Sequence, residues 1–208
     1  FTIDENTTTV TTLVTTDADT NTTVTYSITG GADASSFALT NDRILRISGT
    51  DYESGKTSYE VIVTATDNDG TNSTPQTITV TIKDVNDNAP VFTNNTSFPL
   101  SENETFVTEL VTTDADTNPT VTYSITGGAD ASSFAVTEAG VLTINGTDYE
   151  SGKTDYEVIV TANDGVNAAD ATFRLTIEDV NDNAPVFTSD STFTIDENTT
   201  AVTTLATT

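Results

Sequence analysis

The chain has 208 residues and a formal net charge of −26, because 32 acidic residues outnumber 6 basic ones. This charge argues against nucleic acids and anionic membranes as partners, and we expect bound cations to offset the repulsion. With no Cys and no His, the chain has no disulfide and lacks the usual nucleophile–base pairs, so we expect no enzymatic activity. It has no membrane-spanning apolar run, no Met and no signal peptide, so we expect a segment or a processed product that does not insert into a membrane.

Alternating apolar and polar residues predict short β-strands through the first hundred residues. The alternation is strict in residues 24–28, 59–65 and 78–82, which is typical of half-buried strands. Residues 40–43 separate two apolar runs and predict a hairpin, and no stretch shows helical periodicity. We therefore predict an all-β, immunoglobulin-like Greek-key sandwich. In chain order the seven expected strands are 1–3, 9–16, 24–28, 36–39, 44–47, 59–65 and 78–82.

The same pattern then repeats, which predicts tandem sandwiches. Residues 15–37 match residues 112–134 except that Pro119 replaces Thr22. The opening Phe1-Thr-Ile-Asp-Glu-Asn returns as a variant at Phe98 and unchanged at Phe193. We expect a first repeat over residues 1–88, a second over residues 89–183, and the start of a third, its first strand region, over residues 184–208.

A polar connector closes each repeat. Residues 84–90 read Asp-Val-Asn-Asp-Asn-Ala-Pro and recur unchanged at residues 179–185. The Asp and Asn side chains and the Val85 carbonyl offer hard oxygen ligands, which suit Ca²⁺ better than zinc or copper. An Asx-rich turn between domains is the alternative. Recurrence at the same place in two repeats, with acidic clusters in register, favours the metal.

Four acidic motifs accompany the connector in each repeat, and together they resemble the cadherin repeat family over the whole chain. The motifs are Glu-Asn near the start, Asp-Ala-Asp after the second strand, Asp-Tyr-Glu before the long strand, and a single Asp after it. In the first repeat they begin at Glu5, Asp17, Asp51 and Asp67. The resemblance implies cadherin-like seven-stranded sandwiches with calcium ions at the junctions between repeats.

The resemblance also implies the ligands, with three Ca²⁺ ions per complete junction. Asp84 fits the motif but is a weaker candidate, and Asp33 lies in a turn outside the clusters, where we expect a substitution to have little effect on calcium binding. The junction between repeats one and two would use Glu5, Asp51, Glu53, Val85, Asn86, Asp87, Asn88, Asp114, Asp116, Asn118 and Asp164. A lower half-site for a third repeat would use Glu102, Asp148, Glu150, Val180, Asn181, Asp182 and Asn183. An upper half-site for a preceding repeat would use Asp17, Asp19, Asn21 and Asp67.

This reading predicts a calcium-rigidified extracellular rod, at the cell surface or secreted, that serves cell adhesion or surface projection. A structural segment of an extracellular fibre is the alternative, and a polysaccharide-binding module is third, because the chain has no Trp to stack on sugars. The expected partners are neighbouring repeats of the same parent chain, with homophilic or fibre-forming contacts as a further alternative. The near-identical repeats indicate recent duplication, as in large repetitive surface proteins, many of them microbial.

Overall fold

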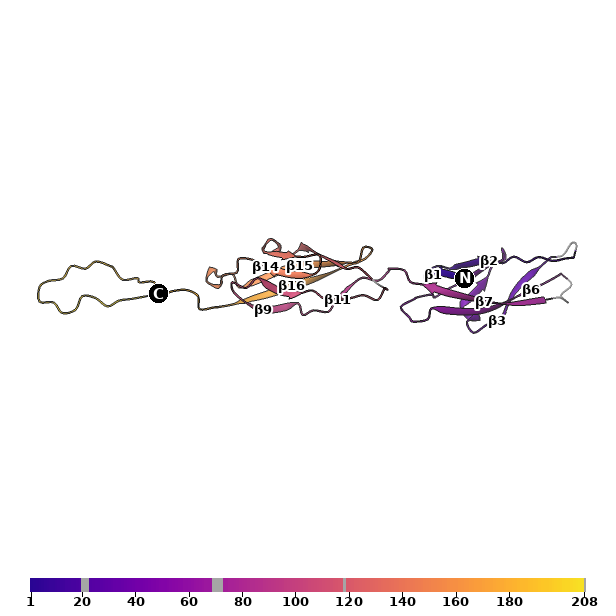
Figure 1. The fold of residues 1–208 in the computed structure, drawn as a ribbon, viewed down its shortest axis with the longest axis horizontal. Coiled ribbons are helices and arrows are strands. Elements are labelled where there is room, and N and C mark those ends of the chain that lie inside the picture. Colours follow the sequence, from indigo (N-terminus) through magenta and orange to yellow (C-terminus); the bar gives the residue numbers. More distant parts are fainter. Residues whose placement is uncertain (20–22, 69–72, 118, 208) are drawn as a thin grey trace.

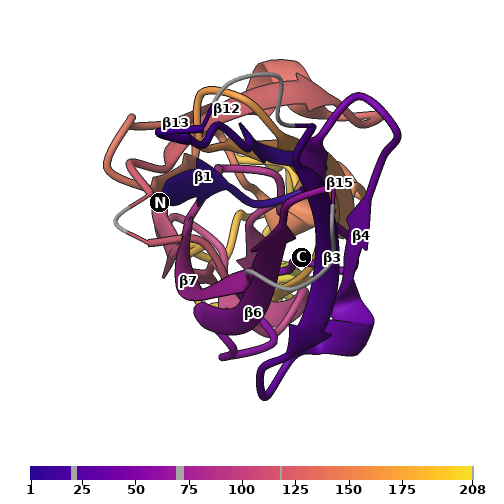
Figure 2. The same cartoon turned by 90° about the vertical axis from the view of Figure 1, so that its right-hand side faces the viewer.

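The computed structural model describes residues 1–19, 23–68, 73–117 and 119–207. Two β-sandwiches follow one another along a single long axis, and a segment without sheets extends from the second and folds back on itself (Figure 1). Seen along that axis, the two sandwiches overlap (Figure 2). Among the described residues, no helix has the length and apolar character needed to cross a membrane. The predicted all-β tandem architecture is confirmed.

The first repeat packs a four-stranded sheet, ordered β1-β7-β6-β3, against a three-stranded sheet, ordered β2-β5-β4. Strand β1 pairs in parallel with β7, and the other pairs are antiparallel. The expected hairpin is present, because Leu39 pairs with Leu45 across it. The strands are β1 (Thr2–Asp4), β2 (Thr9–Thr12), β3 (Thr25–Gly30), β4 (Phe37–Leu39), β5 (Ile44–Ile47), β6 (Ser58–Thr66) and β7 (Ser73–Lys83).

The second repeat has the same two sheets, ordered β12-β15-β16-β9 and β10-β14-β13. An additional short pair, β8 with β11, lies at the end that faces the first repeat. The strands are β8 (Val91–Phe92), β9 (Ser97–Ser101), β10 (Phe106–Glu109), β11 (Thr112–Thr113), β12 (Thr122–Gly127), β13 (Phe134–Val136), β14 (Val141–Ile144), β15 (Asp155–Asn163) and β16 (Ala168–Glu178).

Each repeat has its own apolar core, built from the inward residues of the alternating strands. Val61 and Val80 of the first repeat are fully buried, as are Val158 and Val160 of the second. Burying one such side chain stabilises the fold by roughly 1.5–3 kcal/mol. Because the two cores share no residue, each repeat has the apolar packing needed to fold as a separate unit.

Several local features differ from the sequence prediction, among them β7, which begins at Ser73 rather than at residue 78. The second strand ends at Thr12 rather than at residue 16, and the backbone N–H of Leu13 donates instead to the carbonyl of Arg43 at 2.8 Å. A 3₁₀ turn, η1 (Ala34–Ser36), follows Gly31, which has a φ of 107°. A Cβ on Gly31 would lie 2.5 Å from a backbone atom of β6, so the close approach of the turn to the sheet requires glycine. The second repeat has the same turn, η2 (Ala131–Ser133), and a third, η3 (Tyr149–Ser151).

Asp33 has structural contacts of its own, while its small expected effect on calcium binding stays a prediction. Its carboxylate accepts a hydrogen bond from the N–H of Glu60 at 2.9 Å and forms an ion pair with Lys56. The hydrogen bond from Lys56 holds the pKa of Asp33 below its usual value. The Lys56 ammonium lies 4.7 Å from the centre of the Tyr59 ring, a cation–π contact. Asp33 therefore ties the η1 turn to β6, and Asp130 does the same in the second repeat.

Candidate metal centre

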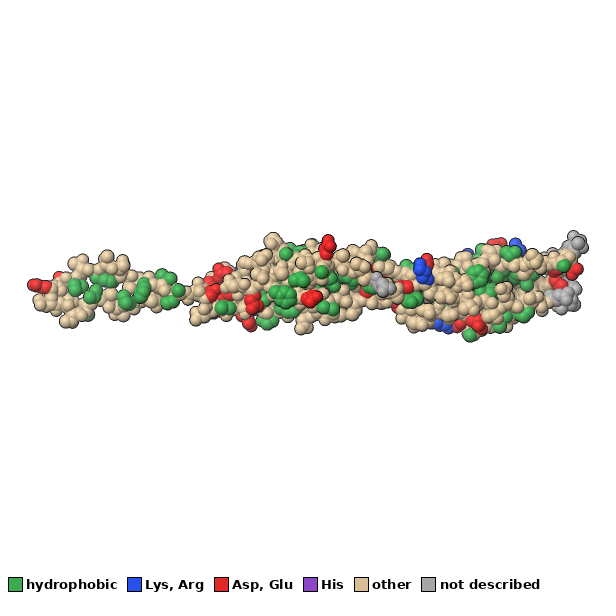
Figure 3. Space-filling model, viewed as in Figure 1, with side chains coloured by type: hydrophobic (Ala, Val, Ile, Leu, Met, Phe, Trp, Pro, Cys, Tyr) green, Lys and Arg blue, Asp and Glu red, His purple; other side chains and the backbone are tan. Residues whose placement is uncertain are grey.

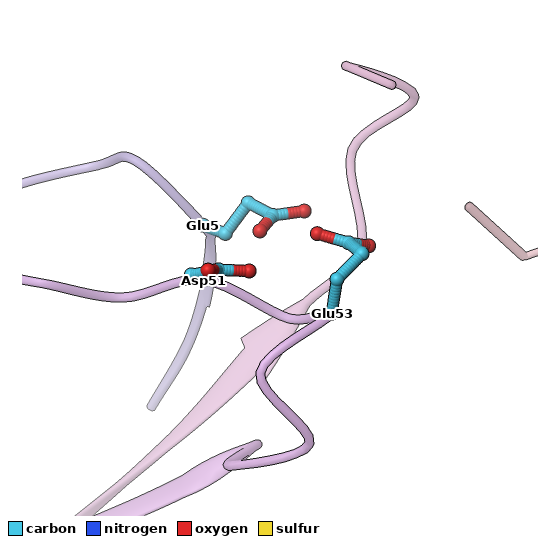
Figure 4. A group of neighbouring side chains, drawn as sticks. All are labelled: Glu5, Asp51 and Glu53. Carbon is cyan, nitrogen blue, oxygen red and sulfur yellow. The ribbon is translucent and has the colours of Figure 1, made fainter. Parts of the chain in front are cut away.

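Glu5 organises the lower side of the junction. It follows β1, is 3% exposed, and accepts hydrogen bonds from the backbone N–H groups of Tyr52 at 2.6 Å and Val85 at 2.9 Å. One carboxylate thus holds both the Asp51–Glu53 loop and the connector after β7. Figure 4 shows the carboxylates of Glu5 and Glu53 pointing toward one another. Such an approach of like charges favours either a cation or a proton between them.

Asp87, in the connector, shares a group of neighbouring carboxylates with Glu53. Its Oδ2 accepts a hydrogen bond from the side-chain amide of Asn6 at 2.7 Å, and its Oδ1 accepts one from that of Asn88 at 2.9 Å. Burial raises the pKa of Asp87, and the negative charges of Glu5 and Asp116 raise it further. The site therefore holds this carboxylate in a fixed orientation within a negative environment.

The second repeat supplies the upper side from two loops. Asp114 and Asp116 follow β11, and the N–H of Asp116 donates to Asp114 Oδ1 at 3.1 Å. Asp164 follows β15, and its Oδ1 accepts 2.7 Å hydrogen bonds from the N–H groups of Val166 and Asn167. Burial alone would raise the pKa of Asp164, but these backbone hydrogen bonds hold it below its usual value. The predicted ligand Asn118 lies outside the described residues.

Direct hydrogen bonds join the connector to the second repeat. The backbone and side-chain N–H groups of Asn88 each donate to Asp116 at 3.0 Å. Asp84 Oδ2 accepts hydrogen bonds from the Thr117 hydroxyl and, at 2.8 Å, from the Thr117 backbone N–H, and these bonds lower the pKa of Asp84. One Asp84 oxygen is therefore already used by protein donors. Its other oxygen, Oδ1, is buried and has no hydrogen-bond partner, so the weaker rank of Asp84 as a ligand stays a prediction.

The side-chain oxygen of Asn86 lies beside carboxylate oxygens of the second repeat. Its side-chain oxygen lies 3.0 Å from Asp164 Oδ2 and 3.2 Å from Asp116 Oδ2, and only the reversed amide would donate hydrogen bonds to them. The Asn167 amide donates to the Asn86 side-chain oxygen at 3.1 Å and to its backbone carbonyl at 3.3 Å. The reversed amide satisfies both contacts without a cation, so the Asn86 side chain is not by itself evidence for a metal.

The junction collects its carboxylates into three overlapping groups, within each of which the oxygens lie no more than 4.8 Å apart. Glu53 belongs to two of the groups and so does Asp116, so that the groups form a continuous series from one repeat to the other. All seven carboxylates predicted for this junction take part, while their role as ligands stays a prediction. The groups are Glu5 with Asp51 and Glu53, Glu53 with Asp87 and Asp116, and Asp114 with Asp116 and Asp164.

Unsatisfied oxygens show that this site fits Ca²⁺. Glu53 Oε1, Asp84 Oδ1 and Asp114 Oδ2 are buried and have no hydrogen-bond partner, which is a costly state for a carboxylate unless a cation binds it. Burial raises the pKa of Glu53 to about 6, helped by the charges of Glu5 and Asp84. The donors are all carboxylate, amide and carbonyl oxygens, the hard ligands that Ca²⁺ prefers.

The far end of the second repeat repeats the lower half of this arrangement. Glu102 is 3% exposed and accepts hydrogen bonds from the N–H groups of Tyr149 at 2.7 Å and Val180 at 2.9 Å. Glu102, Glu150 and Asp182 form a further carboxylate group within 4.8 Å, from which Asp148 is absent. Acidic side chains gather at this end in Figure 3. The predicted Asn183 donates to Asp182 Oδ1 at 2.7 Å, and no hydrogen bond is recorded for the Asn181 side chain within the described part of the chain.

The predicted upper half-site at the free end of the first repeat is less compact. Asp17 Oδ1 accepts a hydrogen bond from the N–H of Asp19 at 2.9 Å, and Asp17 and Asp67 line one surface pocket. Within the part of the chain that the structure describes, these residues form no three-carboxylate group. Asn21 lies outside the described residues.

Sequence reasoning did not single out Thr117, Asn167 and the amide of Asn6 as contributors to the junction. Thr117 and Asn167 lie within three residues of predicted ligands, and Asn6 directly follows Glu5. Their recurrence beside the acidic motifs was the available signal. Which oxygen each one contacts depends on the packing of the two repeats.

The chain is similar in sequence and in fold to known proteins. Residues 1–83 match the family described as Cadherin domain. Protocadherin Fat 4 of Mus musculus is 34% identical over 187 residues, a match that covers 86% of this chain and 4% of that relative. The crystal structure of human Protocadherin-24 EC1-2 aligns with a TM-score of 0.72 at 22% identity, covering 86% of this chain and 94% of that one. The structure of Protocadherin Gamma B2 extracellular cadherin domains 3-6 aligns with a TM-score of 0.60 at 26% identity, covering 82% and 44%.

These matches confirm the tandem β-sandwich fold, and the matched domains of Protocadherin Gamma B2 are described as extracellular. The matched proteins are described as cadherins and protocadherins. The chain spans 4% of the length of Protocadherin Fat 4. The expected microbial origin of the chain stays a prediction. By these matches, residues 1–83 correspond to a cadherin domain, and the chain as a whole is similar to the cadherin repeats of these proteins.

Proposed function

We propose that the two repeats form one segment of a calcium-rigidified extracellular rod that serves cell adhesion or projects a binding surface from the cell. The observation that carries this proposal is the series of three overlapping carboxylate groups, to which both repeats contribute. Neither repeat alone has the full set. A cation that needs ligands from both repeats binds only when they are aligned, and so its binding energy favours the straight arrangement.

The chain's own residues prepare this junction. Glu5 fixes the connector against the first repeat, while Asn88 and Asp84 hydrogen-bond it to the second. Calcium, when bound, supplies positive charge that offsets the repulsion among the carboxylates. At a free concentration one hundred times its dissociation constant, a ligand stabilises the bound state by about 2.7 kcal/mol. The proposed ligands are Glu5, Asp51, Glu53, Val85, Asn86, Asp87, Asn88, Asp114, Asp116, Asn118 and Asp164, and they would hold three ions.

Neighbouring repeats of the same parent chain are the proposed partners. The group of Glu102, Glu150 and Asp182 matches the lower half of the junction, and a following repeat would complete it. Residues 184–207 form no sheet beyond a bridge between Phe187 and Thr207, and we propose that they open that repeat. The proposed repeat boundaries are 1–88 and 89–183.

Calorimetric calcium titration and small-angle X-ray scattering test the proposal together. We expect one tight class of three ions per chain and a single elongated particle in calcium. Chelation should broaden the distribution of maximum dimensions while circular dichroism still reports folded sandwiches. Adding a complete third repeat should roughly double the tight class. Scattering and protease sensitivity at residues 84–88 that do not respond to EDTA would refute the rod.

Bead aggregation separates adhesion from projection. Beads coated with the chain should cluster in calcium and disperse in EDTA if the repeats bind one another. Beads that stay dispersed while the rod remains rigid would restrict the function to projection.

A further inference from the structure

An asparagine follows the first Glu of each repeat, and its backbone conformation is unusual. Asn6, Asn103 and Asn198 have φ values of 57°, 63° and 68°, in the left-handed region that Asn tolerates better than most residues. Glycine adopts this region more readily still. The backbone conformation therefore does not explain why the residue carries an amide.

The amide contacts explain it in the two folded repeats. Asn6 Nδ2 donates to Asp87 Oδ2 at 2.7 Å, and Asn103 Nδ2 donates to Asp182 Oδ2 at the same distance. The backbone N–H groups of Asn6 and Asn103 each donate at 3.1 Å to the hydroxyl of a threonine that is 4% exposed. The buried threonine fixes the backbone, and the left-handed turn then directs the amide at the connector Asp.

We propose that Asn6 and Asn103 are positioning residues, which orient the connector carboxylates of Asp87 and Asp182 for a divalent cation. This inference rests on the proposed function. The amide is a neutral donor, so it holds the carboxylate without cancelling the negative charge that a cation needs. Asp87 shares a carboxylate group with Glu53 and Asp116, and a rotated Asp87 would leave that group incomplete. Residues that hold metal ligands in place typically affect metal affinity by about 10- to 100-fold.

The test uses the full chain with Asn6→Gly, which keeps the left-handed backbone and removes only the amide. We expect calcium affinity at the junction to fall about tenfold, while the melting temperature in excess EDTA changes little. Asn198→Gly is the matched control, because Asn198 has the same conformation but lies exposed in residues 184–207. Asn103→Gly should also leave the first junction unchanged, because its amide contacts Asp182.

A double-mutant cycle separates positioning from a general structural role. If Asn6 acts through Asp87, Asn6→Gly should cause no further loss of affinity in an Asp87→Asn background. Equal losses in both backgrounds, or a wild-type affinity retained by Asn6→Gly, would overturn this inference and leave the proposed function standing. A wild-type chain that binds no calcium would overturn the proposed function and this inference with it.

Discussion

Lowering the pH from 7.5 to 5 should weaken calcium binding at the junction by about tenfold, because protons compete for the Glu53 carboxylate. Burial and the charges of Glu5 and Asp84 raise the pKa of Glu53 to about 6. If only the ionised group binds the cation, the affinity falls by a factor of 1 + 10^(pKa − pH), which is about 11 at pH 5 and about 1 at pH 7.5. The raised pKa of Asp87 acts in the same direction.

The metal-free protein should respond in the opposite sense. A carboxyl group whose pKa is raised by folding stabilises the fold below its unfolded pKa, 4.5 for Glu53, and loses this contribution as the pH rises through about 6. In EDTA the chain should therefore melt at a higher temperature at pH 5 than at pH 7.5. Asp84 and Asp164 have lowered pKa values, so they oppose this trend only at more acidic pH.

Isothermal titration calorimetry at pH 7.5, 6 and 5 measures the affinity, and buffers of different ionisation heat report the protons released on binding. Glu53→Gln removes the titrating group and should flatten most of the pH dependence. Glu150→Gln, at the equivalent position of the second repeat, should leave the dependence at the first junction intact. An affinity that is constant from pH 7.5 to 5 would refute the assignment of Glu53 as the proton-competing ligand.

Three further substitutions test the site and the fold. Asp116→Ala removes a carboxylate shared by two groups and should weaken calcium binding by more than about tenfold. Asp42→Ala, in an exposed turn, should leave calcium binding unchanged. Equal losses of calcium affinity in the two variants would indicate diffuse charge screening. Leu45→Ala removes a fully buried side chain and should lower the free energy of unfolding of the first repeat by about 2–5 kcal/mol in urea titration, with the second repeat unaffected. Gly31→Ala places a Cβ 2.5 Å from the backbone of β6 and should lower the free energy of unfolding of the first repeat by more than about 1 kcal/mol. Gly55→Ala is the control, because Gly55 has open space around it, and it should destabilise the repeat less. Equal shifts of the melting temperature would contradict the clash at Gly31.

The fold class follows from local patterns. The strict alternation in residues 59–65 reports which side chains of a strand face inward, since successive residues of a strand point to opposite faces. Those predicted core residues, Tyr59, Val61 and Val63, are buried. The end of the second strand was missed, because Thr-rich residues 13–16 have strand propensity, yet Leu13 bonds to a distant loop instead of continuing the ladder. Propensity describes a residue, whereas a strand ends where its partner ends.

The sequence by itself determined the tandem repeats, the sandwich, and the seven carboxylates that meet between the two repeats, because these follow from periodicity and residue type. Only the tertiary structure decided how those oxygens are shared out. Glu53 Oε1 is left without a donor, Asp84 Oδ2 is taken by Thr117, and Asp87 is held by an amide 81 residues away in the chain. Hydrogen bonds form or fail over a few tenths of an ångström, and such distances between remote loops are set by the packing of whole sheets, which no local pattern records.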